Sequence, residues 1–499
     1  MHVVADSPAA TLETLVLGEG YAALGEDFVE RRDPTPLPDP YLIATSGEVA
    51  RLVDLQTDQM DRPEFVRLAA GNARFGAIQP FAAVYAGHQF GTFVPRLGDG
   101  RAITLGEQLL PSGARFEWQL KGAGPTAFSR FGDGRAVLRS TIREFLCSEA
   151  MAALGIPTTR ALAIAGSAEP VFRETPETAA VLTRVAPSLI RFGTFEFFHY
   201  QRRSDAVKTL ADYTITRFYP HLSGIAVDAD RYAAFFGEVV ARTAATIARW
   251  QAVGFAHGVM NTDNMSILGL TLDYGPFGFL DAYEPGFICN HTDEGGRYAF
   301  DRQPTIGLWN CHALAAALSS LIDRSDAETV LATYEHAFRT TYVTLLCEKF
   351  GLLEVRDGDA ELFGTCFRAL ENGSVDYTRF FTALGDVADD TGSAGERLAA
   401  SFDNAAQWSD WQRRYAARVA DDPRSPRARR AAMSAVNPRY VLRNYLAQDA
   451  IAAAQRGDYA EIARLQAALQ TPFDERPEYA AYAAAPPESA RAISVSCSS

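Results

Sequence analysis

Extended, turn-rich segments alternate with short apolar runs in the first part of the chain. Residues 79–125 contain a Gly-Asp-Gly turn at 98–100 between two extended runs, which predicts a β-hairpin. The run WQLK then predicts a strand that ends at Lys121. Residues 158–195 return to short apolar runs such as AVLTRV, so we expect several short strands there as well.

The spacing of apolar residues changes to a helical period between residues 135 and 154. Gly155 and Pro157 follow this run and mark its end. We expect one buried helix at this place in the chain. Its apolar stripe consists of Leu138, Ile142, Phe145, Leu146 and Ala150.

Helical periodicity dominates from residue 205 onward. It is clearest at 231–254, and long Ala-rich helical segments are expected at 310–345 and 437–469. A compact stretch at 257–281 interrupts the helices. A β-rich part that holds one helix, followed by a helical part, predicts an α+β protein with two lobes.

The same pattern suggests how the chain is divided. No Gly-x-Gly-x-x-Gly opens a helix, and no βαβ repeat is present. We expect an N-terminal extension at 1–78, a β-rich N-lobe at 79–195, a helical C-lobe at 196–345, a C-terminal helical region at 346–485 and a flexible tail at 486–499.

Composition narrows the possible functions. The 499 residues are 47% hydrophobic and carry a net charge of −14, which disfavours a nucleic-acid binder. The six cysteines form no CxxC pair, which excludes a cysteine-ligated zinc ribbon. No apolar run reaches membrane-spanning length and no secretory signal begins the chain, so we expect a cytoplasmic protein without membrane contact.

The strongest chemical signal is His257-Gly258-Val259-Met260-Asn261-Thr262-Asp263-Asn264, followed by Asp273-Tyr274-Gly275. Small-molecule kinases of the protein-kinase fold carry His-Gly-Asp and then Asn at the same spacing, before an Asp-Phe-Gly. The carboxylate and the amide oxygen can meet on Mg²⁺ that bridges nucleotide phosphates. The alternative is an Asx-rich turn with a hydrogen-bonded histidine.

One position departs from the kinase pattern. Val259 stands where the catalytic Asp would be, and its side chain cannot accept a proton. Asp263, beside the candidate metal ligand Asn264, is a possible replacement base.

Lys121 is a candidate for phosphate binding. It is one of only three lysines among 47 basic residues, and a helix follows it. Glu144, 23 residues further on, is a candidate partner, although periodicity does not choose it over Glu149. The alternative is a solvated lysine at a strand end.

Two copies of GDGRA are candidate phosphate loops. Gly98, Gly100 and Arg101 belong to the first copy. Asp133 and Gly134 belong to the second, which precedes the expected helix and could form an anion site at its N-terminus. A plain β-turn and a helix-capping Asp are the alternatives.

The sequence resembles the selenoprotein O family, whose members are kinase-fold adenylyltransferases. The matching stretches are YAGHQFGTFVPRLGDGRA, WQLKGAGPTAFSRFGDGRAVLRSTIREFL, HGVMNTDN with LDYG, and NPRYVLRNYL. The resemblance implies a protein-kinase-like fold and a nucleotide bound in a flipped orientation. AMP would pass from ATP to a Ser, Thr or Tyr hydroxyl of a protein, with release of pyrophosphate.

The resemblance also implies roles for individual residues. Glu144 would pair with Lys121, Asp263 would act as the base, and Asn264 and Asp273 would hold Mg²⁺ or Mn²⁺. The residues implied in ATP binding are Gly98, Gly100, Arg101, Lys121, Asp133, Gly134, Arg184, Arg191 and Asp273. From the residues alone, Arg184 and Arg191 are isolated arginines, which are usually surface residues.

Eukaryotic members of this family carry selenocysteine third from the C-terminus, where this chain has Cys497. This indicates a cysteine-containing, bacterial-type member. Cys289 follows the Asp-Tyr-Gly segment, and we hypothesise a regulatory disulfide between the two cysteines, against the alternative of a free thiol and a buried one. We expect a monomer that acts on proteins; an ATP-binding pseudokinase scaffold and an atypical phosphotransferase remain alternatives.

Overall fold

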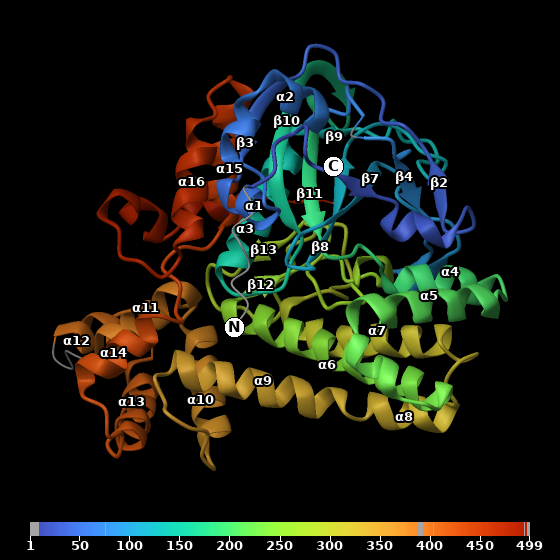
Figure 1. The fold of residues 1–499 in the computed structure, drawn as a ribbon. Coiled ribbons are helices and arrows are strands. Elements are labelled where there is room, and N and C mark those ends of the chain that lie inside the picture. Colours follow the sequence, from blue (N-terminus) through green and yellow to red (C-terminus); the bar gives the residue numbers. More distant parts are fainter. Residues whose placement is uncertain (1–8, 75, 388–392, 403, 494, 497–499) are drawn as a thin grey trace.

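One antiparallel sheet forms the upper part of the molecule in the computed structural model, which describes residues 9–74, 76–387, 393–402, 404–493 and 495–496 (Figure 1). β1 (Leu17–Gly18) pairs with β7, and β9 (Ala136–Val137) pairs with β11. The sheet runs in the order β2 (Val29–Arg31), β4 (Phe81–Ala83), β7 (Ala102–Leu109), β8 (Arg115–Lys121), β11 (Pro176–Ala186), β10 (Arg160–Phe172) and β3 (Tyr41–Thr45).

The predicted strand that ends at Lys121 is confirmed as β8. The expectation of short strands at 158–195 is wrong, because β10 and β11 form one long hairpin and α4 (Phe192–Tyr200) already begins within that range. The register of this hairpin against β8 places Arg184 opposite Gln119. Two segments that are distant in sequence thus lie side by side in the sheet.

The predicted hairpin at Gly-Asp-Gly 98–100 is also wrong. β5 (Gly87–Gln89) and β6 (Thr92–Val94) pair with each other, whereas β7 pairs with β4 and β8. The turn instead folds back along the chain, where the Asp99 amide donates to Ala83 O at 3.0 Å. Long-range pairing, and not the turn itself, therefore decides the strand partners.

The predicted helix at 135–154 is confirmed as α3 (Leu138–Ala153). It is buried on both sides, against β10, β11 and two C-terminal helices. The second GDGRA copy ends at Ala136, which already belongs to β9, and Val137 is the N-cap residue, so Asp133 and Gly134 lie before this strand and not at the helix N-terminus. The expected anion site at this helix N-terminus is therefore not formed.

Helices cover the side of the molecule below the sheet (Figure 1). The segment at 310–345 is not one long helix, because turns after residues 317 and 331 divide it. The helices of this part are α4, α5 (Ser204–Phe218), α6 (Asp228–Val253), α7 (Gln303–Ala317), α8 (Arg324–Leu331) and α9 (Tyr334–Lys349). β12 (Phe255–Ala256) and β13 (Gly278–Phe279) form a small antiparallel pair after α6.

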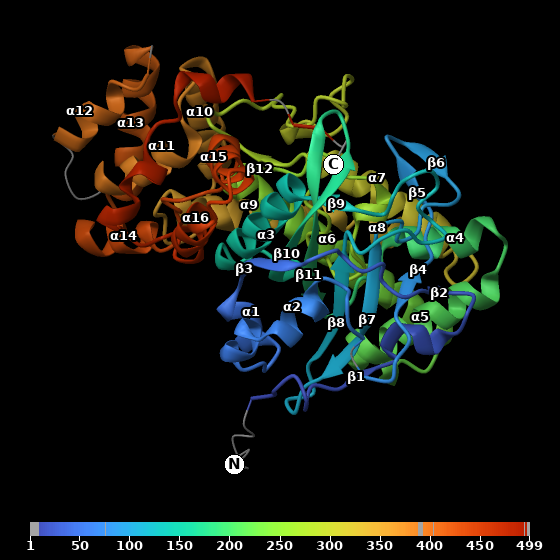
Figure 2. The same cartoon turned by 90° about the horizontal axis from the view of Figure 1, so that it is seen from above.

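The C-terminal helices occupy one side of the molecule when it is seen from above (Figure 2). Residues 437–443 are not helical, and a break at 456–459 divides the rest of the expected segment 437–469 into two helices. The set comprises α10 (Asp359–Asn372), α11 (Tyr377–Val387), α12 (Ser393–Ala399), α13 (Ala405–Val419), α14 (Pro426–Ser434), α15 (Asn444–Gln455) and α16 (Ala460–Gln470). The last two return to the sheet and pack against α3.

Short helical elements complete the structure. α1 (Gly47–Leu52) and α2 (Pro63–Ala69) lie beside the sheet (Figure 2). Turns of 3₁₀ helix occupy Gly20–Leu24, Thr57–Asp61, Pro220–Gly224, Thr262–Asn264, Phe300–Arg302, Pro477–Ala483 and Glu488–Ala492. Across the described part of the chain, every helix is too short or too polar to cross a bilayer.

Candidate functional site

A cavity of about 560 Å³ lies between the sheet and the segment 257–276. Its walls bring together candidate residues that are more than 170 positions apart in the sequence. The predicted residues that line it are Gly98, Gly100, Arg101, Lys121, Asp133, Gly134, Arg184, Arg191, Asp263, Asn264 and Asp273. Glu144 is buried directly behind this wall.

Lys121, in the cavity wall, forms an ion pair with Glu144, which lies behind the wall. The Lys121 ammonium at the end of β8 lies 2.6 Å from Glu144 Oε2 on α3. The other oxygen of Glu144 accepts a hydrogen bond from Arg184 at 2.9 Å. Glu149 is also buried, but it pairs with Arg160 at 2.8 Å. The structure thus makes the choice between the two glutamates that helical periodicity left open.

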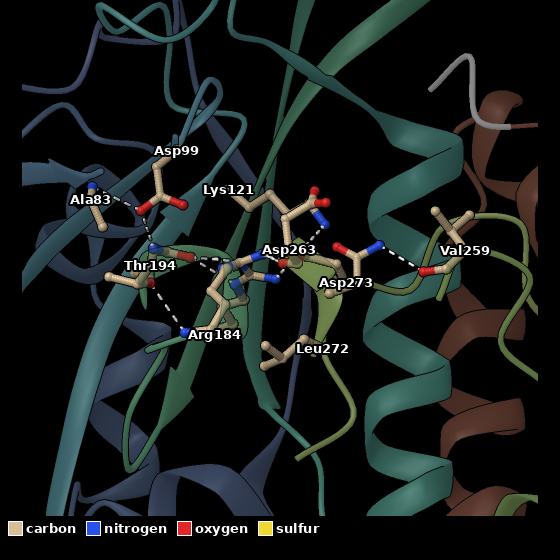
Figure 3. A network of polar contacts seen from close by, with 12 residues as sticks. Ala83, Asp99, Lys121, Arg184, Thr194, Val259, Asp263, Leu272 and Asp273 are labelled. Carbon is tan, nitrogen blue, oxygen red and sulfur yellow. Dashed lines mark hydrogen bonds and ion pairs between the residues drawn. The ribbon is translucent and has the colours of Figure 1, made fainter. Parts of the chain in front are cut away.

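Asp273 is surrounded by three cations (Figure 3). Its Oδ1 atom lies 2.9 Å from the Lys121 ammonium and 2.6 Å from Arg184. Its Oδ2 atom lies 2.6 Å from Arg191. Burial opposes ionisation, but the three cations outweigh it and hold the pKa of Asp273 well below its usual range. Asp273 is therefore a carboxylate.

The backbone of Asp273 is strained as well. Its φ of 56° lies in the left-handed region, which residues other than glycine rarely adopt. Such conformations persist only where the surroundings enforce them, and they are frequent at functional sites.

Arg184 and Arg191 are buried, so the alternative of surface arginines does not apply. Across the strand pair, the side-chain amide oxygen Oε1 of Gln119 accepts from Arg184 Nε at 2.9 Å and from Arg184 Nη2 at 2.7 Å. Burial alone would lower the pKa of each arginine, but nearby anionic groups, with Asp273 prominent among them, raise it above its usual value. Both guanidinium groups thus keep their charge inside the protein.

The side-chain amide nitrogen of Asn264 is engaged in a hydrogen bond within the protein. Its Nδ2 atom donates to the Val259 carbonyl at 2.9 Å, which leaves the amide oxygen as the remaining polar atom of the side chain. Asn264 and Asp273 both line the cavity. Among the described residues, no three His, Cys, Asp or Glu side chains gather as a metal cluster. Two oxygen donors in a cavity that is also lined by several cationic side chains nevertheless fit Mg²⁺, which usually binds few protein ligands and completes its shell with phosphate and water.

Asp263 is buried in the wall of the same cavity, beside Asn264. Its Oδ2 atom accepts a long hydrogen bond from Gln89 at 3.4 Å, and its Oδ1 atom has no hydrogen-bond partner among the described residues. Burial raises the pKa of Asp263 to about 7. A carboxylate in this setting can accept a proton near neutral pH.

The first GDGRA loop approaches the cavity through a close backbone contact. Gly98 has a φ of +64°, and a Cβ atom there would lie 2.2 Å from the Phe128 ring, so only glycine fits. Arg101 follows the loop and also faces the cavity, where burial lowers the pKa of its guanidinium.

Asp133 in the second GDGRA copy does not face the cavity with a free carboxylate. It pairs with Arg173, whose Nη1 lies 2.8 Å from Asp133 Oδ2, and this bond lowers the pKa of the carboxyl group. Sequence reasoning missed Arg173 together with Arg130 and Arg135, which line the same cavity. The repeated Arg of the GDGRA motif was the available signal for Arg135, whereas nothing in the local sequence distinguishes Arg173.

Cys289 is buried, with its Sγ atom 3.5 Å from the Ala256 carbonyl. Next to it, Asn290 forms a parallel β-bridge with Val495, and the His291 amide donates to Val495 O at 3.1 Å. The C-terminal segment therefore reaches the neighbourhood of Cys289. Cys497, the second cysteine of the hypothesised pair, lies outside the described residues.

The cations, the carboxylates and the cavity together define a site that can bind a polyphosphate, and comparisons with known proteins agree with this class. The sequence model of the family described as protein adenylyltransferase SelO matches residues 12–470. The chain therefore belongs to this family, as the resemblance in its motifs indicated, and it is a protein nucleotidyltransferase.

Full-length relatives support the same assignment. A protein nucleotidyltransferase YdiU of Myxococcus xanthus is 54% identical over 98% of this chain and 100% of its own length. Proteins with the same name from Thioalkalivibrio sulfidiphilus and Thiobacillus denitrificans are 52% and 51% identical, each over 98% of this chain and at least 99% of their own length.

Proposed function

We propose that the protein transfers AMP from ATP to hydroxyl groups of other proteins at the cavity described above. The observation that carries this proposal is the convergence of Lys121, Arg184 and Arg191 on the Asp273 carboxylate, in a cavity that Asp263 also lines. Among the described residues, these three cations form ion pairs with two carboxylates, Glu144 and Asp273, and Arg101, Arg130, Arg135 and Arg173 line the same cavity, so positive charge remains for a bound anion. A triphosphate supplies the complementary charge.

The role of the phosphate-binding residues follows from their chemistry. The two buried arginines offer planar guanidinium forks, and Lys121 offers a compact ammonium. Arg101 adds a further cation, and Gly98 and Gly100 allow the backbone to approach a phosphate. Gly134 and Asp133 contribute from the second loop, the latter by holding Arg173 at the cavity.

Asn264 and Asp273 would hold Mg²⁺, or Mn²⁺ in its place. Such an ion neutralises charge on the phosphates and on the departing pyrophosphate. The ionised state of Asp273 and the remaining amide oxygen of Asn264 are the features of this chain that suit the ion.

Asp263 would act as the base. Its carboxylate accepts the proton of the acceptor hydroxyl, the hydroxyl oxygen bonds to the α-phosphorus of ATP, and the bond between that phosphorus and the β-phosphate oxygen breaks. Pyrophosphate leaves with the electron pair of that bond. The acceptor protein then carries AMP as a phosphodiester.

The kinase-like division into two lobes is part of this proposal. The antiparallel sheet with α3 against it corresponds to the N-lobe, and α4 to α9 correspond to the C-lobe. The Lys121–Glu144 pair between a strand and a helix supports it, since protein kinases hold their phosphate-binding lysine in the same way. The C-terminal helices would buttress the sheet through α3.

Labelled ATP distinguishes this function from its alternatives. We expect label from α-labelled ATP to enter acceptor proteins of a bacterial extract, whereas label from γ-labelled ATP does not. Transfer from the γ position alone would indicate a phosphotransferase, and ATP binding without transfer would indicate a scaffold. Intact-mass analysis of labelled acceptors should show the mass of AMP.

A disulfide between Cys289 and Cys497 is a further part of the proposal. The bridge between Asn290 and Val495 supports it, because it brings the chain next to each cysteine together. Peptide mapping of the oxidised protein without reductant should find the 289–497 linkage. Failure to find it under oxidation would reject the disulfide and leave the transfer reaction untouched.

A further inference from the structure

The β5–β6 hairpin contacts the candidate base and the two residues before it. The His88 amide donates to Thr262 Oγ1 at 2.7 Å, and the Phe90 amide donates to Asn261 Oδ1 at 3.2 Å. Between them, Gln89 Nε2 donates to Asp263 Oδ2 at 3.4 Å. Three consecutive residues of the hairpin, 88–90, thus form hydrogen bonds with three consecutive residues that end at the candidate base, 261–263.

Buried groups keep the hairpin in this place. The Tyr298 hydroxyl donates to Asn261 Oδ1 at 2.6 Å and accepts from the Phe90 amide at 3.0 Å. Glu196 on α4 is fully buried, and its two carboxylate oxygens bind His88 Nδ1 and the Thr262 hydroxyl. A buried carboxylate with partners on both segments joins them more firmly than a solvent-exposed contact does.

Two glycines allow the close approach. A Cβ atom on Gly87 would lie 2.7 Å from Asp263 Oδ1, and one on Gly193 would lie 2.1 Å from the Ala86 carbonyl. The Ala86 amide donates to Gly193 O at 3.0 Å, which fixes the start of the hairpin against α4. Asp263 therefore has little room to turn on the side of its Oδ1 atom.

We propose that Gln89 and Gly87 are positioning residues for Asp263: the amide of Gln89 holds Oδ2, and the bare backbone of Gly87 sets where Oδ1 lies. Gln89 and Asp263 both line the cavity. In the proposed reaction, Gln89 therefore contacts the same carboxylate that would accept the proton of the acceptor hydroxyl. Holding a base in one orientation raises the rate of proton transfer without tightening nucleotide binding. This inference rests on the role of Asp263 in the proposed function.

Two substitutions of similar size test the Gln89 contact. Gln89→Met keeps the length of the side chain and removes the donor, whereas Gln89→Glu places a second carboxylate against Asp263. We expect kcat for AMP transfer to an acceptor from the labelling experiment to fall roughly tenfold in Gln89→Met and further in Gln89→Glu. The dissociation constant of Mg-ATP should stay within about twofold of the wild-type value, because Gln89 contacts none of the three phosphate-binding cations.

Thr92→Ala is the matched control, since Thr92 lies opposite Gln89 in the same hairpin and is exposed. It should keep the wild-type kcat. Gly87→Ala should lower kcat as well, because its new methyl group would displace Asp263 Oδ1. Thermal unfolding shows whether each variant is folded, and the Gln89 variants keep the test valid if Gly87→Ala does not fold.

The outcomes separate this inference from the function on which it rests. Full activity in Asp263→Ala would overturn the base itself and the positioning role with it. Loss of activity in Asp263→Ala together with wild-type kcat in both Gln89 variants would overturn the positioning role alone. Equal losses in Gln89→Met, Gln89→Glu and Thr92→Ala would show that the hairpin has only a structural role.

Discussion

The three lysines of this chain occupy three different environments, and only one of them suits catalysis. Lys121 lies between Glu144 and Asp273 at the cavity. Lys208 is half exposed and pairs with Asp212 one helical turn away. Lys349 is buried against the Phe381 ring and donates to Asn437 at 2.9 Å, and burial lowers the pKa of its ammonium to about 7. Of the two lysines that are not solvated surface residues, Lys121 therefore lies at the proposed site and Lys349 has a structural role.

Replacing Lys121 tests its place in the site. Lys121→Ala removes a cation from Asp273 and from the cavity, so AMP transfer should fall by roughly 100-fold or more. Lys208→Ala removes an exposed ion pair and should change the rate little. Initial rates with α-labelled ATP measure both, and similar rates for the two variants would show that Lys121 does not bind phosphate.

Asp273 offers a complementary test. Asp273→Asn keeps the size of the side chain but removes the charge that Arg184 and Arg191 neutralise. We expect the protein to lose the Mg²⁺ dependence of ATP binding, and transfer should fall by at least about 100-fold. Calorimetric titration with ATP, with Mg²⁺ and with EDTA, measures the first effect. Unchanged Mg²⁺ dependence would remove Asp273 from the metal site.

At the scale of elements, the sequence predicts what is locally encoded. The strand that ends at Lys121 and the helix at 138–153 have strong apolar patterns and clear ends, and both are confirmed. The long hairpin of β10 and β11 and the breaks between α7, α8 and α9 were missed. They depend on pairing and packing with distant segments, which a window of neighbouring residues does not contain.

The same distinction holds for the site. Motifs named many of the residues that line the cavity, among them Lys121, Asp263 and Asp273, since these residues lie in recognisable local patterns. Arg184 and Arg191 lie outside those patterns and were implied only by the family resemblance. Gln119 and Arg173 were missed, because their contacts with Arg184 and Asp133 depend on strand register and on loop packing. Gln89 was missed for the same reason: its contact with Asp263 spans 174 residues.

Strand β8 contains a group whose charge should affect stability. Glu117 is buried, and burial raises the pKa of its carboxyl group to about 8, from 4.5. Between these values the folded protein binds more protons than the unfolded chain, so the stabilisation present below pH 4.5 is lost as the pH rises to 8. Glu107, opposite Glu117 on β7, adds to the upward shift.

Glu117→Gln should remove this pH dependence. The amide stays neutral and can still accept the hydrogen bond from the Leu189 amide, which measures 2.9 Å to the glutamate oxygen. The free energy of unfolding of the wild type should decrease when the pH is raised from 5 to 8. We expect this decrease to exceed the one in the variant by on the order of 3 kcal/mol. Urea unfolding at both pH values measures the difference, and parallel pH profiles would contradict the assignment.

At the scale of the whole molecule, the C-terminal helices are tied to the part that holds the site. Arg143 on α3, beside Glu144, donates to the Phe277 carbonyl at 2.8 Å and also to Asn444 of α15. Arg443 precedes α15 and joins Asp281 at 2.6 Å to Asp376 at 2.9 Å. These contacts connect the helix that bears Glu144, the segment after Asp273 and the C-terminal helices.

Arg443 is the point at which this connection can be tested. Arg443 is almost fully buried, whereas the side chains of Asp376 and Asp281 are 14% and 36% exposed, so Arg443→Ala would leave two partly solvated carboxylates without their shared cation. Breaking a fully buried ion pair costs about 3–5 kcal/mol; because water reaches both carboxylates here, we expect the unfolding free energy in urea to fall by a smaller amount, on the order of 2 kcal/mol. Arg464→Ala, which removes an exposed pair with Glu461, is the control and should change stability by less than about 1 kcal/mol. If Arg443→Ala keeps wild-type stability, the C-terminal helices do not support the sheet through this residue. If it loses stability while the folded fraction keeps the wild-type affinity for ATP, the helices support the fold and leave the cavity itself unchanged.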